Sequence, residues 1–179
     1  MKKQSLSLLL AGLLSSGSAM ADAGYFDVIY SPQTGEMTKT IGFGVYALND
    51  NGVGGYFNGM IPIKPSNYSA GYYCWYSCAE MATGQAAYVG NLGFTFPLIP
   101  SSFEKRGYQS VHAYVGLGYA AIEGMVKYSD GTWTDDTNRD KNGFNANGGI
   151  IVAFDPISIN VGVNSFTKAV YLGLGFKTK

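Results

Sequence analysis

The sequence predicts an all-β protein, an eight-stranded antiparallel up-and-down β-barrel that crosses a membrane. Three observations lead to this fold class: an N-terminal export signal, segments in which apolar residues alternate with small or polar ones, and a low content of charge. Charged residues make up 13% of the 179 residues, about half the usual share for a soluble domain. An exported chain of this kind, without apolar stretches long enough for membrane helices, can span a membrane only as a closed barrel.

Residues 1–21 have the form of a cleaved signal peptide. Two lysines are followed by an apolar stretch at residues 6–14, and Ala19-Met20-Ala21 matches an A-x-A cleavage site. The apolar stretch is shorter than the roughly 20 residues that a membrane helix needs. We therefore expect cleavage before Asp22, which leaves residues 22–179 as one barrel domain; a retained N-terminal anchor is the alternative.

The charge balance of this domain excludes one class of partner. Two of the 12 basic residues lie in the signal peptide, which leaves 10 basic against 12 acidic residues in residues 22–179 and a formal net charge of −2. No basic surface for nucleic acid is expected. The sequence also shows no cofactor-binding motif.

Strict alternation identifies the strands. In residues 157–163 the isoleucines and valines alternate with Ser158, Asn160 and Gly162, the two-residue period of a strand with one apolar face. The same pattern extends over 11 residues from Val111 to Ala121, which matches the 9 to 11 residues of a tilted membrane strand. The charge of Glu123 places the membrane boundary just before it. Taken along the chain, the pattern gives eight strands at about residues 24–31, 38–48, 53–63, 84–97, 108–129, 143–154, 157–165 and 168–177.

The connections alternate between two kinds. Residues 49–52, 98–107 and 155–156 form one set of turns, and residues 32–37, 64–83, 130–142 and 166–167 form the other set. In bacterial barrels the short turns face the periplasm and the long loops face outward. We therefore expect both termini in the periplasm and the longest loops at the cell surface.

The two faces of the strands predict different surroundings. The apolar face is expected to meet lipid, with aromatic residues near both interfaces: Phe94, Phe96, Phe154 and Phe176 at the periplasmic rim, and Tyr30, Tyr88, Tyr119 and Phe144 at the outer rim. The other face is expected to fill a narrow lumen with glycine and polar residues, among them Tyr46, Tyr114, Tyr171 and the carboxylate of Asp27. A buried carboxylate needs a partner, which the sequence does not identify. A soluble β-sandwich is the alternative, although its outer face should carry more charge.

These segments resemble a known family. Residues 170–176 (VYLGLGF) look like the closing strand of outer-membrane barrels, and residues 114–119 (YVGLGY) and 145–154 (NANGGIIVAF) are similar to the transmembrane domain of outer membrane protein A and its small porin-like relatives. The resemblance implies that Tyr171, Gly173, Leu174 and Phe176 form the signal for the barrel-assembly machinery. It also implies an integral outer-membrane protein of a Gram-negative cell, in contact with lipopolysaccharide. The three residues after Phe176 depart from the pattern, in which the aromatic residue usually ends the chain.

The longest loop carries two cysteines and an aromatic cluster. Cys74 and Cys78 are four residues apart, and in an oxidising compartment we expect a disulfide rather than free thiols. Two thiolates are too few for a zinc site, and no metal site is expected. The aromatic residues Tyr72, Tyr73, Trp75 and Tyr76 are candidates for contact with a partner surface or glycan; the alternative is that they rest on the barrel rim or in the lipopolysaccharide layer.

Catalysis is not expected. Ser110 and His112 share the inward face near the periplasmic end of their strand, whereas an enzyme acting on lipid A in the outer leaflet would need the opposite end. Their order is also the reverse of the His-x-Ser order of the lipid A deacylases that they resemble. The acidic residues between Asp130 and Asp140 lack the glycine and final glutamate of a calcium loop.

The sequence therefore predicts a monomeric outer-membrane barrel without enzymatic activity, with a structural or surface-interaction role and a plugged or narrow lumen. A minor channel for small solutes is the second hypothesis, and a lipid A-modifying enzyme is the third. An eight-stranded barrel has an interior about wide enough for its own side chains, which favours the plugged form.

Overall fold

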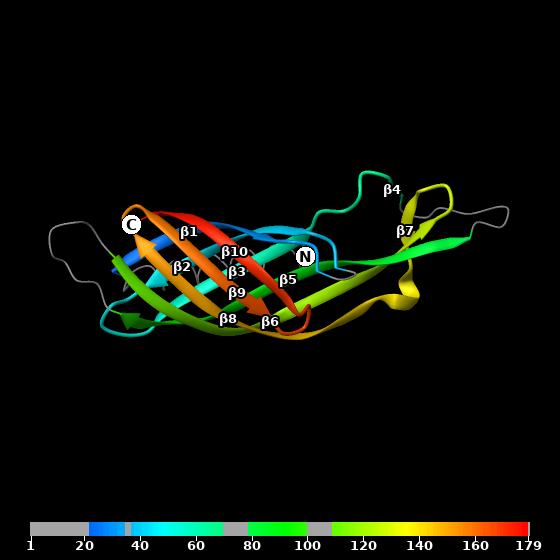
Figure 1. Ribbon diagram of the computed structural model, residues 1–179. Coiled ribbons are helices and arrows are strands. Elements are labelled where there is room, and N and C mark those ends of the chain that lie inside the picture. Colours follow the sequence, from blue (N-terminus) through cyan, green and yellow to red (C-terminus); the bar gives the residue numbers. More distant parts are fainter. Residues whose placement is uncertain (1–21, 35–36, 70–78, 100–108, 179) are drawn as a thin grey trace, which may run out of the picture.

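The computed structural model describes residues 22–34, 37–69, 79–99 and 109–178, and its elements are shown in Figure 1. Residues 1–21 and 70–78 lie outside this description, so the signal peptide, the cysteine pair and the aromatic cluster around that pair stay predictions. The eight barrel strands are β1 (Ala23–Ser31), β2 (Thr40–Leu48), β3 (Gly54–Pro62), β5 (Glu80–Ile99), β6 (Gln109–Tyr128), β8 (Lys141–Phe154), β9 (Ile157–Asn164) and β10 (Ala169–Lys177).

These strands form a closed antiparallel barrel. Each one pairs with its neighbour in the chain, and β1 pairs with β10 to complete the circle. The closing register places Tyr25 opposite Lys177 and Tyr30 opposite Leu172. The predicted fold class, an eight-stranded up-and-down barrel, is therefore confirmed.

Side-chain exposure follows the predicted alternation. Leu117, Val161 and Leu174 are exposed on the outside of the barrel, whereas Tyr114 and Asn160 are buried inside it. The predicted rim aromatics are also on the outer face, and all are well exposed except Tyr88, which is half-buried. The outer surface of the barrel strands is thus an apolar band, as a lipid-facing surface requires.

The barrel has two unlike ends. One end, which we call the turn end, carries the start of β1, the end of β10 and the β2–β3, β5–β6 and β8–β9 connections. The other, the loop end, carries the connections after β1, β3, β6 and β9. This parity is the predicted one.

Strands β5 and β6 extend well beyond the barrel at the loop end (Figure 1). Each has 20 residues, about twice the length that crosses a bilayer. β3 last pairs with β5 at Val89, and β8 last pairs with β6 at Ile122. We call the projecting part the tongue: it consists of β4 (Tyr68–Ser69), residues 80–88 of β5 and residues 123–140, which contain the end of β6, β7 (Trp133–Asp135) and the short 3-10 helix η1 (Thr137–Arg139).

The tongue is where the structure departs most from the prediction. Residues 80–83 belong to β5 rather than to a loop, and β4, β7 and η1 lie within segments expected to be irregular. These segments are ordered because they pack into a small core. Met125 is fully buried in this core, and the Trp133 ring lies so close to Gly84 that a Cβ on Gly84 would stand 2.9 Å from the ring. None of the described helices is long and apolar enough to cross a membrane.

Candidate functional site

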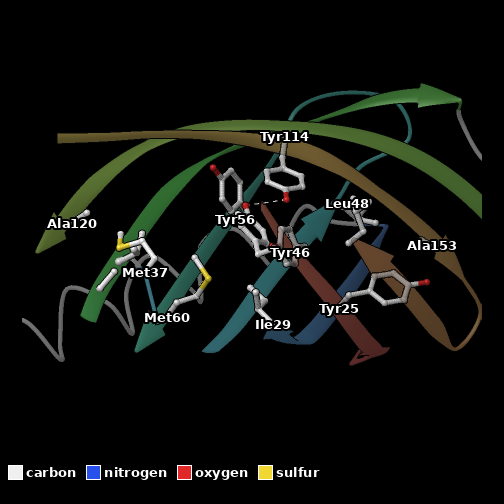
Figure 2. Close-up of a cluster of buried hydrophobic side chains, with 14 of the residues drawn as sticks. Tyr25, Ile29, Met37, Tyr46, Leu48, Tyr56, Met60, Tyr114, Ala120 and Ala153 are labelled. Carbon is white, nitrogen blue, oxygen red and sulfur yellow. Dashed lines mark hydrogen bonds between the residues drawn. The ribbon is translucent and has the colours of Figure 1, made fainter. Parts of the chain in front are cut away.

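Tyrosine rings fill the middle of the barrel. The rings of Tyr46, Tyr56 and Tyr114 come from β2, β3 and β6 and meet inside the barrel (Figure 2). Tyr46 stacks on Tyr56 with centroids 5.5 Å apart, and Tyr114 lies tilted at 5.5 Å from Tyr46 and at 5.0 Å from Tyr56. These separations are those of packed aromatic pairs, so the three rings obstruct the bore.

A chain of hydrogen bonds surrounds these rings. We call it the lumen network; its members are buried, inward-facing and polar: Asp27, Tyr46, Tyr56, Asn58, Asn91, Tyr114, Asn145, Asn147, Ser158, Asn160, Asn164 and Tyr171. The lumen network therefore consists of neutral amides and hydroxyls around one carboxylate.

The network begins at Asp27, which is fully buried. Its two carboxylate oxygens accept hydrogen bonds of 2.6 Å, one from the Ser158 hydroxyl and one from the Asn160 amide. The same amide of Asn160 also donates to the Tyr46 hydroxyl at 3.1 Å. These are the partners that the sequence did not identify, and they come from β9, the second strand along from β1 in the barrel wall.

The network continues to the loop end through tyrosine and asparagine. The hydroxyl of Tyr114 donates to that of Tyr171 at 3.0 Å, and Asn147 donates to the same Tyr171 oxygen at 3.0 Å. Further along, Asn145 donates to Asn91 at 2.7 Å and to Asn164 at 2.8 Å. Because buried polar groups are costly without partners, this bonding stabilises the packing of these side chains inside the barrel.

The inward glycines make room for these side chains. A Cβ on Gly162 would stand 2.1 Å from the Tyr114 hydroxyl oxygen, and a Cβ on Gly175 would stand 1.7 Å from an Asp27 carboxylate oxygen. The space that inward glycines would open is thus occupied by the tyrosines and by Asp27. The inward positions predicted for Tyr46, Tyr114 and Asp27 are confirmed.

Ser110 and His112 lie together near the turn end with Asp50, a residue that the sequence did not single out. His112 Nε2 is 3.0 Å from the Ser110 hydroxyl oxygen and 3.4 Å from an Asp50 carboxylate oxygen. A catalytic relay needs the acid and the serine on opposite ring nitrogens, but here both contact Nε2, and no described group bonds Nδ1. The three side chains are buried. This arrangement suits an interior hydrogen-bonded cluster better than a nucleophilic site.

The architecture of the barrel decides the structural class. Eight antiparallel strands close into a barrel, an apolar band faces outward, and the buried face is polar. The chain has the fold of a small eight-stranded outer-membrane barrel. The sequence resemblance to that class is therefore confirmed at the level of the fold.

Comparison with solved structures finds a protein of similar fold. The crystal structure of Ail, the attachment invasion locus protein of Yersinia pestis, is similar to this chain with a TM-score of 0.48 and 11% sequence identity. The match covers 87% of this chain and 93% of the Ail chain. No protein-family model matches the sequence. No curated protein matches it either.

At the base of the tongue, polar contacts join β3, β6 and β7. Lys64, just after β3, forms an ion pair of 2.8 Å with Glu123, and its ammonium group lies 4.1 Å from the centre of the Tyr68 ring. The Tyr68 hydroxyl donates to the Asp135 carboxylate. Partial burial lowers the pKa of Lys64, but the hydrogen bond to Glu123 and the Glu123 charge outweigh it and raise that pKa overall.

The acidic residues of the tongue have structural roles. Asp136 caps η1 by accepting from the Asn138 amide and forms an ion pair of 2.9 Å with Arg139. Asp140 accepts from the Gly124 amide at 2.9 Å. No group of three His, Cys, Asp or Glu residues in the described part of the chain is placed to hold a metal ion.

The remaining predicted site residues divide into two groups. Tyr171 and Gly173 face inward in β10, and Leu174 and Phe176 face outward, but their role as an assembly signal stays a prediction. Cys74, Cys78 and their aromatic neighbours lie outside the described residues. The asparagines of the lumen network were not singled out as a group, although their alternation with apolar residues was the available signal.

Proposed function

We propose that this chain is a surface-exposed outer-membrane protein whose sealed barrel serves as a rigid anchor for the tongue and the adjacent loops. One observation carries the proposal: the bore is packed with tyrosine rings and the lumen network, while β5 and β6 continue beyond the apolar band as residues 80–88 and 123–128. A filled interior leaves the projecting part as the place where the protein meets other molecules.

The membrane orientation follows from the same asymmetry. The tight turns, the start of β1 and the end of β10 lie at one end, and the tongue lies at the other, so the turn end is proposed to face the periplasm and the tongue to face outward. An epitope inserted after Asp130 in the tongue should bind antibody on intact cells, whereas the same epitope after Asn51 in the β2–β3 turn should bind only after the outer membrane is permeabilised. The reverse result would overturn the orientation.

The sealed lumen is tested by electrical recording. The purified protein in planar lipid bilayers should show no steady conductance steps, whereas a variant with Tyr46, Tyr56 and Tyr114 all changed to alanine should conduct. The Phe43→Ala variant, which removes an outward ring, is the control, and a heat-dependent shift in gel migration verifies that each variant is folded. Regular steps from the wild-type protein would instead favour the channel hypothesis.

The surface-interaction role is tested at the loop that leads into the tongue. We propose that Tyr72, Tyr73, Trp75 and Tyr76 provide contact groups for a protein surface or glycan, because aromatic side chains make strong interface anchors. Cells that display the chain with these four residues changed to serine should lose adhesion to immobilised proteins and glycans. A Ser129→Ala variant, altered elsewhere in the tongue, should retain it. Equal adhesion by all three chains would contradict this role.

The absence of enzymatic activity is proposed from the Ser110 cluster. The shared contact of Ser110 and Asp50 with one nitrogen of His112 does not support a relay. Lipid A from cells expressing the wild-type chain or the His112→Ala variant should have the same mass. A mass change that depends on His112 would establish the enzyme hypothesis in its place.

A further inference from the structure

A small cavity lies inside the barrel near the loop end, beneath the segment that joins β1 to β2. Its volume is about 10 Å³, about enough for one water molecule. Part of its lining is apolar and includes Met37 and Met60, which lie close together in Figure 2 on the side of the tyrosine rings away from Tyr25. Met37 is buried in the core cluster, so the part of the β1–β2 connection next to β2 packs into the loop end of the lumen, which we call the outer mouth.

Three buried polar atoms belong to residues that line this cavity. They are the hydroxyls of Thr38 and Thr167 and the amide nitrogen of Asn164, and no described protein group bonds any of them. The Asn164 and Thr167 residues are only 2% and 7% exposed. Buried polar atoms nearly always have a hydrogen-bond partner, because burial without one is costly in free energy. One shared ligand in the cavity would satisfy all three atoms, because the residues that carry them line it together.

The chemistry of Asn164 restricts what that ligand is. Its side-chain oxygen accepts from the amides of Asn145 at 2.8 Å and Asn91 at 3.2 Å. Turning the Asn164 amide over would direct its NH₂ group at these two donors, so the orientation is set, and the unbonded atom is a donor. A metal cation is incompatible with an NH₂ group, whereas a water molecule accepts from the amide and bonds both hydroxyls.

We propose that one water molecule occupies this cavity, accepts a hydrogen bond from Asn164 Nδ2 and bonds the hydroxyls of Thr38 and Thr167. The three residues lie in the β1–β2 connection, at the end of β9 and in the β9–β10 turn. The water thus joins two connections that are far apart in the sequence, and it closes the outer mouth of the lumen above the tyrosine rings. This inference is independent of the proposed surface role.

A crystal structure that resolves individual waters tests the proposal directly. One density peak should lie at about 2.7 to 3.2 Å from all three atoms. An empty cavity, or threonine hydroxyls turned to protein acceptors instead, would overturn the proposal. So would an anomalous signal at this position after a bromide soak, because three donors around an anion would make it a halide site.

A pair of variants tests the structural consequence. Thr167→Val keeps the shape of the side chain but removes the hydroxyl, and it should abolish the density peak. The Thr38 amide donates to the Gln85 carbonyl at 2.8 Å. Hydrogen exchange at this amide should then become about tenfold faster, which corresponds to the loss of roughly one hydrogen bond at the outer mouth of the lumen. Thr34→Val alters an exposed threonine of the same connection and should leave both unchanged. A Thr167→Val protein with the peak retained, or with unchanged exchange, would refute the water bridge.

Discussion

The carboxylate of Asp27 accepts a 2.6 Å hydrogen bond from the hydroxyl of Ser158, a residue 131 positions further along the chain. Strand β10 separates their two strands in the barrel wall. The bond therefore joins β1 to β9 across β10 on the inner face of the barrel, near the seam where β1 pairs with β10. A buried carboxylate is held there by hydrogen bonds from Ser158 and Asn160, with no described ion pair.

Removing the Ser158 hydroxyl should destabilise the barrel. Ser158→Ala leaves Asp27 buried with one fewer donor, and hydrogen bonds to charged groups contribute about 1.5 to 3 kcal/mol. Urea unfolding in detergent micelles, followed by tryptophan fluorescence, should show a loss of that size in the free energy of unfolding. Ser66→Ala, at an exposed serine before β4, should change it by less than about 0.5 kcal/mol. Equal stability of the two variants would contradict the role of this bond.

The inward and outward glycines should differ in their tolerance of alanine. Gly162→Ala places a Cβ against the Tyr114 hydroxyl and the Tyr171 ring, and overpacking of this kind costs about 1 to 3 kcal/mol. Gly90→Ala meets no atom within 4 Å and should be neutral or slightly stabilising. The same urea titration measures both variants. If Gly90→Ala were the more destabilising of the two, the assignment of inner and outer faces would be wrong.

A charge on the apolar band should be costly in a way that exposure alone does not predict. Leu117 and Met81 have the same exposed fraction, 68%, but Leu117 lies within the band and Met81 lies on the tongue. Arginine near the middle of a bilayer costs about 2 to 4 kcal/mol in a barrel. Leu117→Arg should therefore lower the free energy of unfolding in lipid vesicles by that amount, and Met81→Arg should leave it nearly unchanged. Similar losses at both positions would show that lipid does not surround Leu117.

The ion pair between Lys64 and Glu123 should make a small contribution to stability that is lost at alkaline pH. Since the folded-state pKa of Lys64 is raised, the contribution is fully present below the pKa of lysine in the unfolded chain and is lost as the pH rises through the higher folded value. Partly exposed pairs contribute up to about 1 kcal/mol. The difference in unfolding free energy between wild type and Lys64→Met should therefore be constant at neutral pH and shrink above about pH 10. Glu123→Gln should abolish the pH dependence of that difference.

The prediction from sequence succeeded where the signal is local. The segment from Ile157 to Asn164 forms a strand with its isoleucines and valines outward and Ser158 and Asn160 inward, as the alternation indicated. The tongue was predicted only in part, because its residues 80–83 and 133–135 show no apolar alternation. Their order comes from the packing of Trp133 on Gly84 and from pairing with β6, and neither is visible in a short window of sequence.

The candidate site shows the same division. Inward positions for Asp27, Tyr46 and Tyr114 followed from their place in an alternating strand. That the Asn160 amide bonds both Asp27 and Tyr46 did not follow, because this meeting depends on the pairing of strands and on the closure of the barrel. The contact of His112 with Asp50 has the same origin. Asp50 lies in the turn between β2 and β3, whereas His112 lies in β6, which pairs with neither of these strands.

By itself, the sequence determined the number of strands, the face that each side chain takes and the end at which the long connections lie. These properties follow from the two-residue period of an extended chain, which each segment expresses without reference to the others. The tertiary structure alone decided which inward groups bond, how the three tyrosine rings obstruct the bore and where the three unbonded polar atoms line one cavity. Those relationships join residues that are distant in sequence, so they exist only once β1 has paired with β10 and all inward side chains share one small volume.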